Sequence, residues 1–173
     1  AERYGWIWAA IGSHPDDADQ VDAARIARYR ELARSARVKA IGEIGLDYYW
    51  AENPPKERQM ELFRQQVLLA KELGLPVIIH DREAHADTLA LLRELHPAGV
   101  LHCFSGSVEM AKEVAALGMY RGFTGAITFK NACKAPQAAA VVPDDRLLIE
   151  TDCPYMAPEP YRGKRCDSSM LPR

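Results

Sequence analysis

The side chains best suited to binding a metal stand at the ends of short apolar runs. Glu43, His80, His102, Glu150 and Asp152 each follow such a run directly or within three residues. Carboxylates and imidazoles that meet in a buried place need a cation or one another, because an uncompensated buried charge is costly. A lone buried histidine is more often a hydrogen-bonded part of the core. A set in register at successive strand ends instead favours a divalent metal held by nitrogen and oxygen ligands.

We therefore interpret Glu43, His80, His102 and Asp152 as candidate metal ligands. Glu150 is expected to stand behind them and to orient a histidine ligand through a hydrogen bond. Asp152 would orient the attacking water or take its proton, since a metal-bound water ionises near neutral pH.

His14 follows the first apolar run, immediately before Pro15. Proline disfavours helix for the residue before it, which holds this imidazole at a junction of strand and loop. We expect His14 to contact substrate or to donate a proton. His85 and His96 lie in or at the end of a polar helical stretch, and both are interpreted as solvent-exposed.

Parallel strands are needed to bring such side chains together, and short apolar runs do alternate with longer amphipathic segments. Strands are expected over residues 6–11, 39–44, 77–80, 100–104, 120–123 and 147–150. Helices are expected over residues 21–35, 56–73, 84–95, 107–117 and 131–141. Ser107 is the expected N-cap of the fourth helix.

Six βα units fit either an open doubly wound sheet or a (β/α)8 TIM barrel. No G-x-G-x-x-G follows any strand, so the dinucleotide-binding form of the open sheet loses its main support. Polar residues at the carboxyl ends of several strands favour the barrel, whose active sites lie there. The length and composition predict one domain over residues 1–173.

Composition limits the partners. Lysine and arginine total 22 against 24 acidic residues, so binding to a polyanion must be local. Four cysteines without a C-x-x-C pair favour reduced thiols and a cytoplasmic protein. No long apolar run or signal-like start is present in the sequence, which predicts no membrane partner, and no obligate protein partner is evident.

Five segments resemble, in order, the TatD family of metal-dependent deoxyribonucleases. They are residues 11–15 (IGSHP), 40–49 (AIGEIGLDYY), 75–80 (LPVIIH), 101–106 (LHCFSG) and 150–155 (ETDCPY). The resemblance covers nearly the whole chain, and it implies a (β/α)8 barrel that hydrolyses DNA, often as an exonuclease.

The resemblance also implies one or two divalent ions, Mg, Mn or Zn. It assigns Glu43 as the bridging carboxylate, His80 and His102 to one ion and Asp152 to the other. Glu43, Asp152 and His14 become the candidate catalytic residues. The residues expected to bind substrate phosphates, either as a clamp or only as solvated basic turns, are Arg82, Lys130, Arg162, Lys164 and Arg165.

The family's first strand supplies a His-x-His pair to one metal, and this sequence contains none. A complete barrel of this type runs to about 250 residues, so the chain is expected to be truncated at both ends, with about six βα units. We expect such a chain to self-associate through open strand edges and to catalyse weakly or not at all.

Two alternatives remain open. An amidohydrolase-like barrel would use the same site on an amide or ester, and the near-neutral charge agrees with it. The basic turn at 162–165 and the pair Tyr48-Tyr49, a possible stacking platform for bases, favour phosphodiesters. The second alternative is an inactive truncated fragment.

Overall fold

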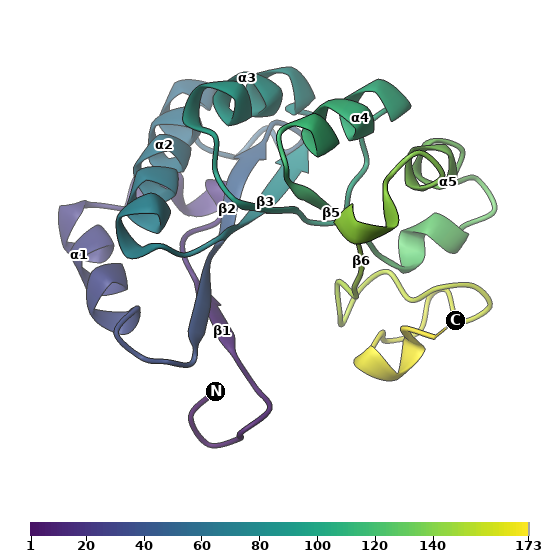
Figure 1. Ribbon diagram of the computed structural model, residues 1–173, viewed down its shortest axis with the longest axis horizontal. Helices are drawn as coiled ribbons and strands as arrows, with labels where there is room; N and C mark the ends of the chain where they lie inside the picture. The colour runs from purple at the N-terminus through teal and green to yellow at the C-terminus, as the bar shows by residue number, and fades with distance from the viewer. Residues whose placement is uncertain (173) are drawn as a thin grey trace. The chain divides into compact units, whose positions relative to one another are not determined.

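The computed structural model describes residues 1–172 and shows an α/β fold in which six parallel strands alternate with helices (Figure 1). The strands are β1 (Ala9–Ile11), β2 (Val38–Asp47), β3 (Val77–Arg82), β4 (Gly99–Leu101), β5 (Tyr120–Phe123) and β6 (Leu147–Ile149), and the sheet follows chain order. The helices are α1 (Ala23–Leu32), α2 (Lys56–Leu73), α3 (His85–Leu95), α4 (Val108–Ala116) and α5 (Lys134–Ala139). Short 3-10 turns are η1 (Pro15–Gln20), η2 (Gly125–Thr128), η3 (Asp144–Arg146) and η4 (Ser168–Met170).

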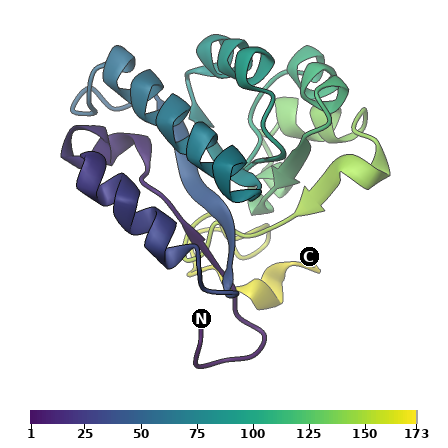
Figure 2. The ribbon, with the colours of Figure 1, turned by 60° about the vertical axis from the view of Figure 1, so that its left-hand side comes forward.

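The chain divides into two compact units, Ala1–Val100 and Leu101–Arg173. In the first unit β1 pairs with β2 and β2 with β3, all parallel. The long helix α2 lies alongside β2 (Figure 2). Its inward face buries Leu62, Phe63 and Val67, against strand residues such as Ile41 and Ile44, which are fully buried. This apolar layer fixes the positions of β2 and β3.

In the second unit β5 pairs with β6 in parallel, and α4 contacts β5. The core here includes Phe104, Met110, Val114 and Phe123. Ser107 accepts a hydrogen bond from the backbone N–H of Met110, which confirms the expected N-cap of α4.

Five of the six strands in residues 1–172 differ from the predicted ranges: β3 continues to Arg82, β6 ends at Ile149, and β1, β2 and β4 differ more. β1 starts at Ala9 and not at residue 6, because Trp6 and Trp8 are exposed and pair with no strand. β4 ends at Leu101 and not at residue 104, because Cys103 adopts a left-handed backbone conformation (φ 46°) that breaks the ladder.

The helices are mostly shorter than predicted. Asp22 caps α1 by accepting from the backbone N–H of Arg25, so residue 21 stays outside the helix. The last helix, α5, covers only Lys134–Ala139, and it carries Pro136 in its first turn, where proline is tolerated. β2 is longer than predicted and continues to Asp47, a difference that matters for the site.

Candidate metal centre and active site

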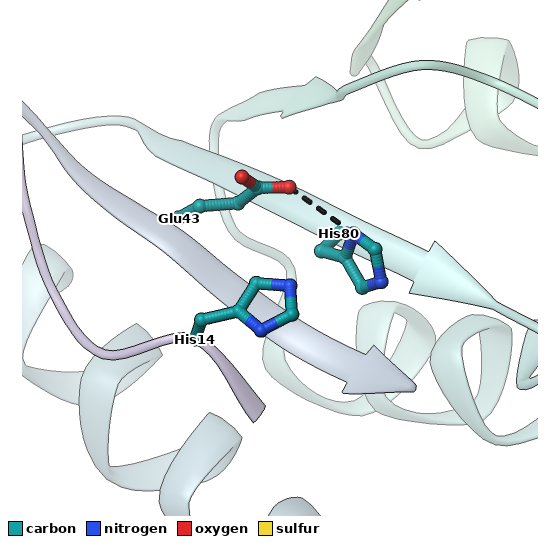
Figure 3. A group of neighbouring side chains, drawn as sticks. All are labelled: His14, Glu43 and His80. Atoms are coloured by element: carbon teal, nitrogen blue, oxygen red, sulfur yellow. Dashed lines mark hydrogen bonds and ion pairs between the residues drawn. The ribbon is translucent and has the colours of Figure 1, made fainter. Parts of the chain in front are cut away.

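Three side chains from the first unit converge on one place, although Glu43 and His80 lie four and two residues before the last residues of their strands and not at the ends that the sequence predicts. Glu43 comes from β2, His80 from β3, and His14 from the loop after β1 (Figure 3). One ligand atom from each lies within 4.8 Å of the other two. His80 Nδ1 is 3.2 Å from Glu43 Oε1, and the two imidazole rings are 4.4 Å apart at their centroids. The sheet therefore produces the close approach of His80 and Glu43 that the sequence predicts, and adds His14 to it.

A fourth residue, Asp47, completes what we call the N-terminal cluster: His14, Glu43, Asp47 and His80. Asp47 ends β2 and is 2% exposed, and its Oδ2 is 3.0 Å from His80 Nε2. Sequence reasoning gave Asp47 no role. The signal was available, because residues 43 and 47 are an even number of places apart on one strand and so share a face.

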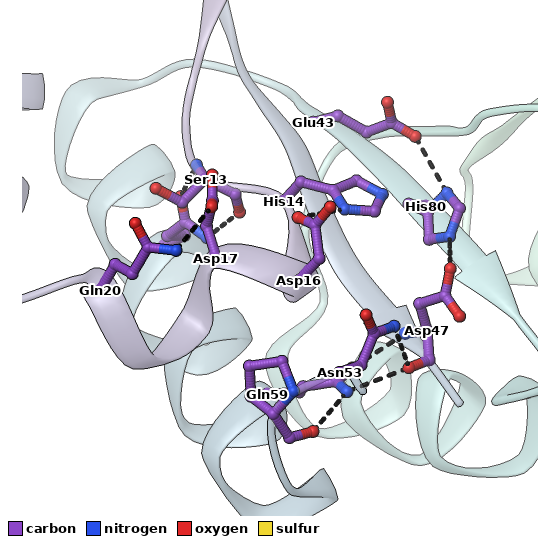
Figure 4. Close-up of polar contacts among 12 residues, drawn as sticks. Ser13, His14, Asp16, Asp17, Gln20, Glu43, Asp47, Asn53, Gln59 and His80 are labelled. Atoms are coloured by element: carbon purple, nitrogen blue, oxygen red, sulfur yellow. Dashed lines mark hydrogen bonds and ion pairs between the residues drawn. The ribbon is translucent and has the colours of Figure 1, made fainter. Parts of the chain in front are cut away.

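Asp47 is itself held in place by a buried amide. The Gln59 side chain of α2 accepts from the Asp47 N–H and donates to the Asp47 carbonyl, at 2.9 and 3.0 Å (Figure 4). Asp47 Oδ1 accepts from the backbone N–H of Tyr49 at 3.0 Å. One oxygen is thus used by the loop and the other faces His80, so the orientation of this carboxylate is fixed.

The two carboxylates set the protonation of His80. Burial alone lowers the pKa of the His80 imidazole, but hydrogen bonds and charges from Glu43 and Asp47 outweigh it and raise the pKa above its usual value. The two carboxylates therefore favour the protonated, positively charged form of the His80 imidazole.

His14 is positioned by the residues on either side of it. Its backbone is extended (φ −64°, ψ 152°) before Pro15, as predicted. Ser13 is tied to the buried Gln66 of α2 by two hydrogen bonds, at 2.7 and 2.9 Å. His14 Nδ1 is 2.7 Å from Asp16 Oδ1, which leaves the other ring nitrogen for the cluster (Figure 4). His14 is therefore placed as a potential ligand, in addition to the expected substrate contact or proton donor.

The donor set of this cluster suits a divalent metal. Ligands at about 2.1 Å in a tetrahedron lie about 3.4 Å from one another, so ligand atoms within 4.8 Å need only small side-chain movements to close on one ion. Two imidazoles and a carboxylate match Zn or Mn chemistry, and a soft thiolate site is not formed by them.

The second unit holds the C-terminal cluster of His102, Glu150 and Asp152. His102 Nδ1 is 2.9 Å from Glu150 Oε2, and His102 Nε2 is 3.5 Å from Asp152 Oδ1. Glu150 Oε1 also accepts from the backbone N–H of Cys103 at 2.7 Å. Glu150 thus stands behind His102 as the sequence predicts, and directs its other nitrogen toward Asp152.

Glycine makes room for this arrangement. A Cβ at Gly122 on β5 would lie 2.2 Å from Glu150 Oε1, closer than any side chain allows.

Burial raises the pKa of the neighbouring Cys103 thiol. The described cysteines are all free, as predicted.

Comparisons with known proteins agree with this geometry. The family model described as TatD related DNase matches residues 1–173. The uncharacterized metal-dependent hydrolase YabD of Bacillus subtilis is 47% identical over 173 residues, covering 98% of this chain and 68% of the relative. The chain belongs to the TatD family. Its relatives include proteins described as metal-dependent hydrolases, which places the chain in that broad class.

Two further TatD proteins refine the comparison. A protein named 3'-5' ssDNA/RNA exonuclease TatD, from Cronobacter sakazakii, is 43% identical, over 99% of this chain and 68% of its own. The crystal structure of YjjV, a TatD homologue from Escherichia coli K12, superposes with a TM-score of 0.89 at 36% identity, covering 95% of this chain and 65% of that one. The expected fold class is confirmed, and the chain spans about two thirds of each relative.

The basic residues expected to bind substrate are all exposed. In the first unit the Arg82 guanidinium carbon lies 3.9 Å from the ring centroid of Tyr49. In the second unit Arg162 lies 4.1 Å from the ring centroid of Phe129, next to Lys130, and Lys164 lies 5.7 Å from that of Tyr161. Their roles in this TatD chain stay predictions.

Two sequence interpretations need correction. The exposed aromatic pair is Tyr49 and Trp50, and not Tyr48 and Tyr49, because the Tyr48 hydroxyl donates to Asp87 at 2.9 Å and its ring is partly buried. His85 is not simply solvated, because its Nδ1 is 2.8 Å from the Asp81 carboxylate. His96 is exposed, as predicted.

The described residues contain no helix long and apolar enough to cross a membrane.

Proposed function

We propose that this chain carries catalytic machinery of a TatD-type deoxyribonuclease, a metal-dependent enzyme that cleaves DNA phosphodiesters from a strand end. The observation that carries the proposal lies in the N-terminal cluster, where the imidazoles of His14 and His80 and the carboxylate of Glu43 bring ligand atoms within 4.8 Å of one another. The name of the Cronobacter sakazakii relative supports single-stranded nucleic acid as the substrate class. DNA is the only partner that the proposal requires, and we place the reaction in the cytoplasm.

The ligands we propose are Glu43, His80 and His14 in the N-terminal cluster, and His102 and Asp152 in the C-terminal cluster. A bound divalent ion, Mg, Mn or Zn, lowers the pKa of its water to about 7 and polarises the phosphoryl oxygen.

The side chains divide the remaining work. Asp47 holds His80 by its Nε2 atom, so that the other ring nitrogen faces Glu43. Glu150 fixes His102 in the same way. Asp152 accepts the proton of the attacking water. His14 has one ring nitrogen on Asp16 and the other for the ion, so the proton taken up by Asp152 is the one that passes to the leaving oxygen.

Arg82 in the first unit, and Lys130, Arg162, Lys164 and Arg165 in the second, bind the phosphates of the strand. Guanidinium groups suit this task because their planar donors match two phosphoryl oxygens at once. Charge on the phosphoryl oxygens grows during the reaction, so these contacts strengthen as the transition state forms.

The test is metal-dependent cleavage by the purified chain after chelation and reloading with Mg, Mn or Zn. End-labelled single-stranded DNA is expected to lose nucleotides from one end, slowly because the sequence has no His-x-His pair, and Glu43→Gln is expected to lose this activity. Glu52→Gln, at an exposed carboxylate, is the matched control.

The same preparations incubated with acyl ester and amide substrates separate the alternatives. Cleavage of these but not of DNA would support the amidohydrolase interpretation. DNA cleavage no faster than that by Glu43→Gln would contradict the proposal and support an inactive fragment.

A further inference from the structure

Three side chains beyond the N-terminal cluster form an exposed surface that we call the aromatic platform: Tyr49, Trp50 and Arg82. Tyr49 is 52% exposed and Trp50 is 48% exposed, and their rings meet edge to face with centroids 4.8 Å apart. The Arg82 guanidinium lies 3.9 Å from the Tyr49 centroid and 5.4 Å from that of Trp50. Within residues 1–172, that guanidinium makes no hydrogen bond or ion pair, and the side chain is exposed, so its donors face solvent.

The loop that carries the platform is held by backbone contacts. The Tyr49 N–H donates to Asp47 Oδ1, and the Tyr48 N–H donates to the Arg82 carbonyl at 2.9 Å. The Asn53 side chain donates to the Asp47 carbonyl at 3.1 Å. Two large aromatic side chains therefore stay about half exposed on a loop held by hydrogen bonds, although burying them fully would be favourable.

The platform is connected directly to the candidate metal site. Asp47 contacts Tyr49 with one carboxylate oxygen and His80 with the other. Arg82 lies two residues beyond His80 on β3, and it pairs in register with Asp47 on β2. Consecutive Cα atoms are about 3.8 Å apart, so Trp50 begins within about 11 Å of Asp47. A strand bound at the metal site would reach the platform with a neighbouring nucleotide.

We propose that the aromatic platform binds an unpaired base of single-stranded nucleic acid by stacking, while Arg82 binds the adjacent backbone phosphate. Aromatic side chains stack on any base, and only an unpaired base has a free face to offer, so the platform would select single strands over duplex. A guanidinium stacked on an aromatic ring keeps its edge donors free for phosphate. The inference rests on the proposed function, and it states which residues select single-stranded over duplex substrate.

The first experiment measures binding of a fluorescently labelled oligothymidylate, without added metal, to the purified chain. Trp50→Ala and Tyr49→Ala are each expected to weaken binding about 10-fold. Trp6→Ala is the matched control, because Trp6 is 73% exposed and lies outside the strands of the first unit, and it should bind as the original chain does. Equal affinity in all four proteins would overturn the proposal.

The second experiment reads the stacking itself. In a Trp6→Phe/Trp8→Phe chain, Trp50 is the only tryptophan left, since the sequence has three. Its fluorescence is expected to be quenched as the oligothymidylate is added, and to a smaller extent by the same length of duplex. Binding without any change in Trp50 fluorescence would contradict stacking on this residue.

The third experiment tests the role of Arg82. Arg82→Ala should weaken binding and reduce the slope of log affinity against log salt by about 0.7, the value for one phosphate contact on a single strand. Arg82→Lys should keep the slope but lower the affinity, because an ammonium group cannot stack on Tyr49 and also bind two oxygens. An unchanged slope in Arg82→Ala would exclude the phosphate contact.

The outcomes separate this inference from the proposed function. Suppose that DNA cleavage depends on Glu43 while Trp50→Ala and the control Trp6→Ala show the same preference for single strands over duplex. In that case the platform assignment is wrong and the proposed nuclease stands. If the platform variants lose binding but no metal-dependent cleavage occurs, the binding site stands and the nuclease is wrong.

Discussion

Asp47 is the carboxylate on which the position of His80 depends, although it is not one of the three side chains grouped around the candidate ion. Its Oδ2 faces His80 Nε2 and its Oδ1 is engaged by the loop. Outer carboxylates of this kind fix the orientation and the basicity of a ligating histidine. His80 therefore presents one defined nitrogen to Glu43.

Asp47→Asn is expected to lower affinity for Zn or Mn by about 10- to 100-fold, because an amide has no charge to support the imidazole as a ligand. Competition with a coloured chelator measures this. Asp19→Asn, at an exposed position in η1, is the control and should bind metal normally. Unchanged affinity in Asp47→Asn would show that Asp47 is only a structural residue.

For single residues, the sequence predicted which side chains belong to the candidate sites better than which of them lie together. Glu43 and His80 were predicted as ligands and do lie together, and Glu150 was predicted behind a histidine and does contact His102. For His14 the sequence predicts only a substrate contact or a proton donor, because its position between strand and loop does not show that its ring lies beside the His80 imidazole. The exposed aromatic pair was placed one residue early, since alternation along an irregular loop cannot be read from sequence.

Single elements differ from the sequence pattern where side chains outside the element decide its ends. Helix α2 matches the predicted residues 56–73 because its apolar face is continuous. β2 extends past the prediction because Gln59 supplies hydrogen bonds that stabilise its last residue. β4 is shorter because Cys103 turns to donate to Glu150, a residue 47 places along the chain. Such long-range contacts leave no local signal.

The N-cap of α4 gives a prediction at this scale. Ser107→Ala is expected to reduce the free energy of unfolding by about 1 kcal/mol, because the N–H of Met110 loses its acceptor. Urea unfolding followed by circular dichroism measures it. Ser107→Asp keeps an acceptor and should recover the stability. Equal destabilisation by both changes would contradict a capping role.

β5 carries an unusual buried charge. Arg121 is fully buried, and its Nε and Nη2 atoms have no hydrogen-bond partner within the described residues. Its Nη1 donates to the Met119 carbonyl, and burial lowers the pKa of the guanidinium. A buried charge satisfied at one of three nitrogens destabilises the strand that carries it.

Arg121→Leu is therefore expected to raise the free energy of unfolding, since an apolar side chain occupies the position without desolvating a charge. Thermal melts measure the change. Arg34→Leu, at an exposed position, is the control and should shift the melting temperature little. A lower melting temperature for Arg121→Leu would show that the arginine contributes an interaction worth keeping.

For the whole molecule, metal binding and stability should be linked. A ligand that binds only the folded chain at about 100 times its dissociation constant adds about 2.7 kcal/mol, which corresponds to a rise of about 5 to 10 °C in melting temperature for a chain of this size. Loading with Zn or Mn should produce such a rise, and chelation should reverse it. Glu43→Gln should melt at the same temperature with or without metal. A metal-dependent rise of the same size in Glu43→Gln would place the ion elsewhere.

Self-association is the second expectation at this scale. On β6, Leu148 is 42% exposed and Ile149 is 66% exposed, so apolar surface faces water. Light scattering should show a mass that increases with concentration, and Ile149→Ser should reduce that increase. A monomer at all concentrations would contradict the expectation. The sequence predicted the α/β class from alternation alone, but it could not say which apolar side chains stay exposed.

Two glycines on either side of β3 limit how this site can evolve. A Cβ at Gly45 would lie 2.0 Å from the His80 carbonyl oxygen, and a Cβ at Gly99 would lie 2.1 Å from the Val77 carbonyl oxygen. Both have φ in the left-handed region, at 141° and 153°, where other residues are strained. A side chain at either position would therefore press against the backbone of the strand that carries His80. We expect these two positions to accept no substitution in descendants that keep metal binding, although neither glycine is a candidate ligand.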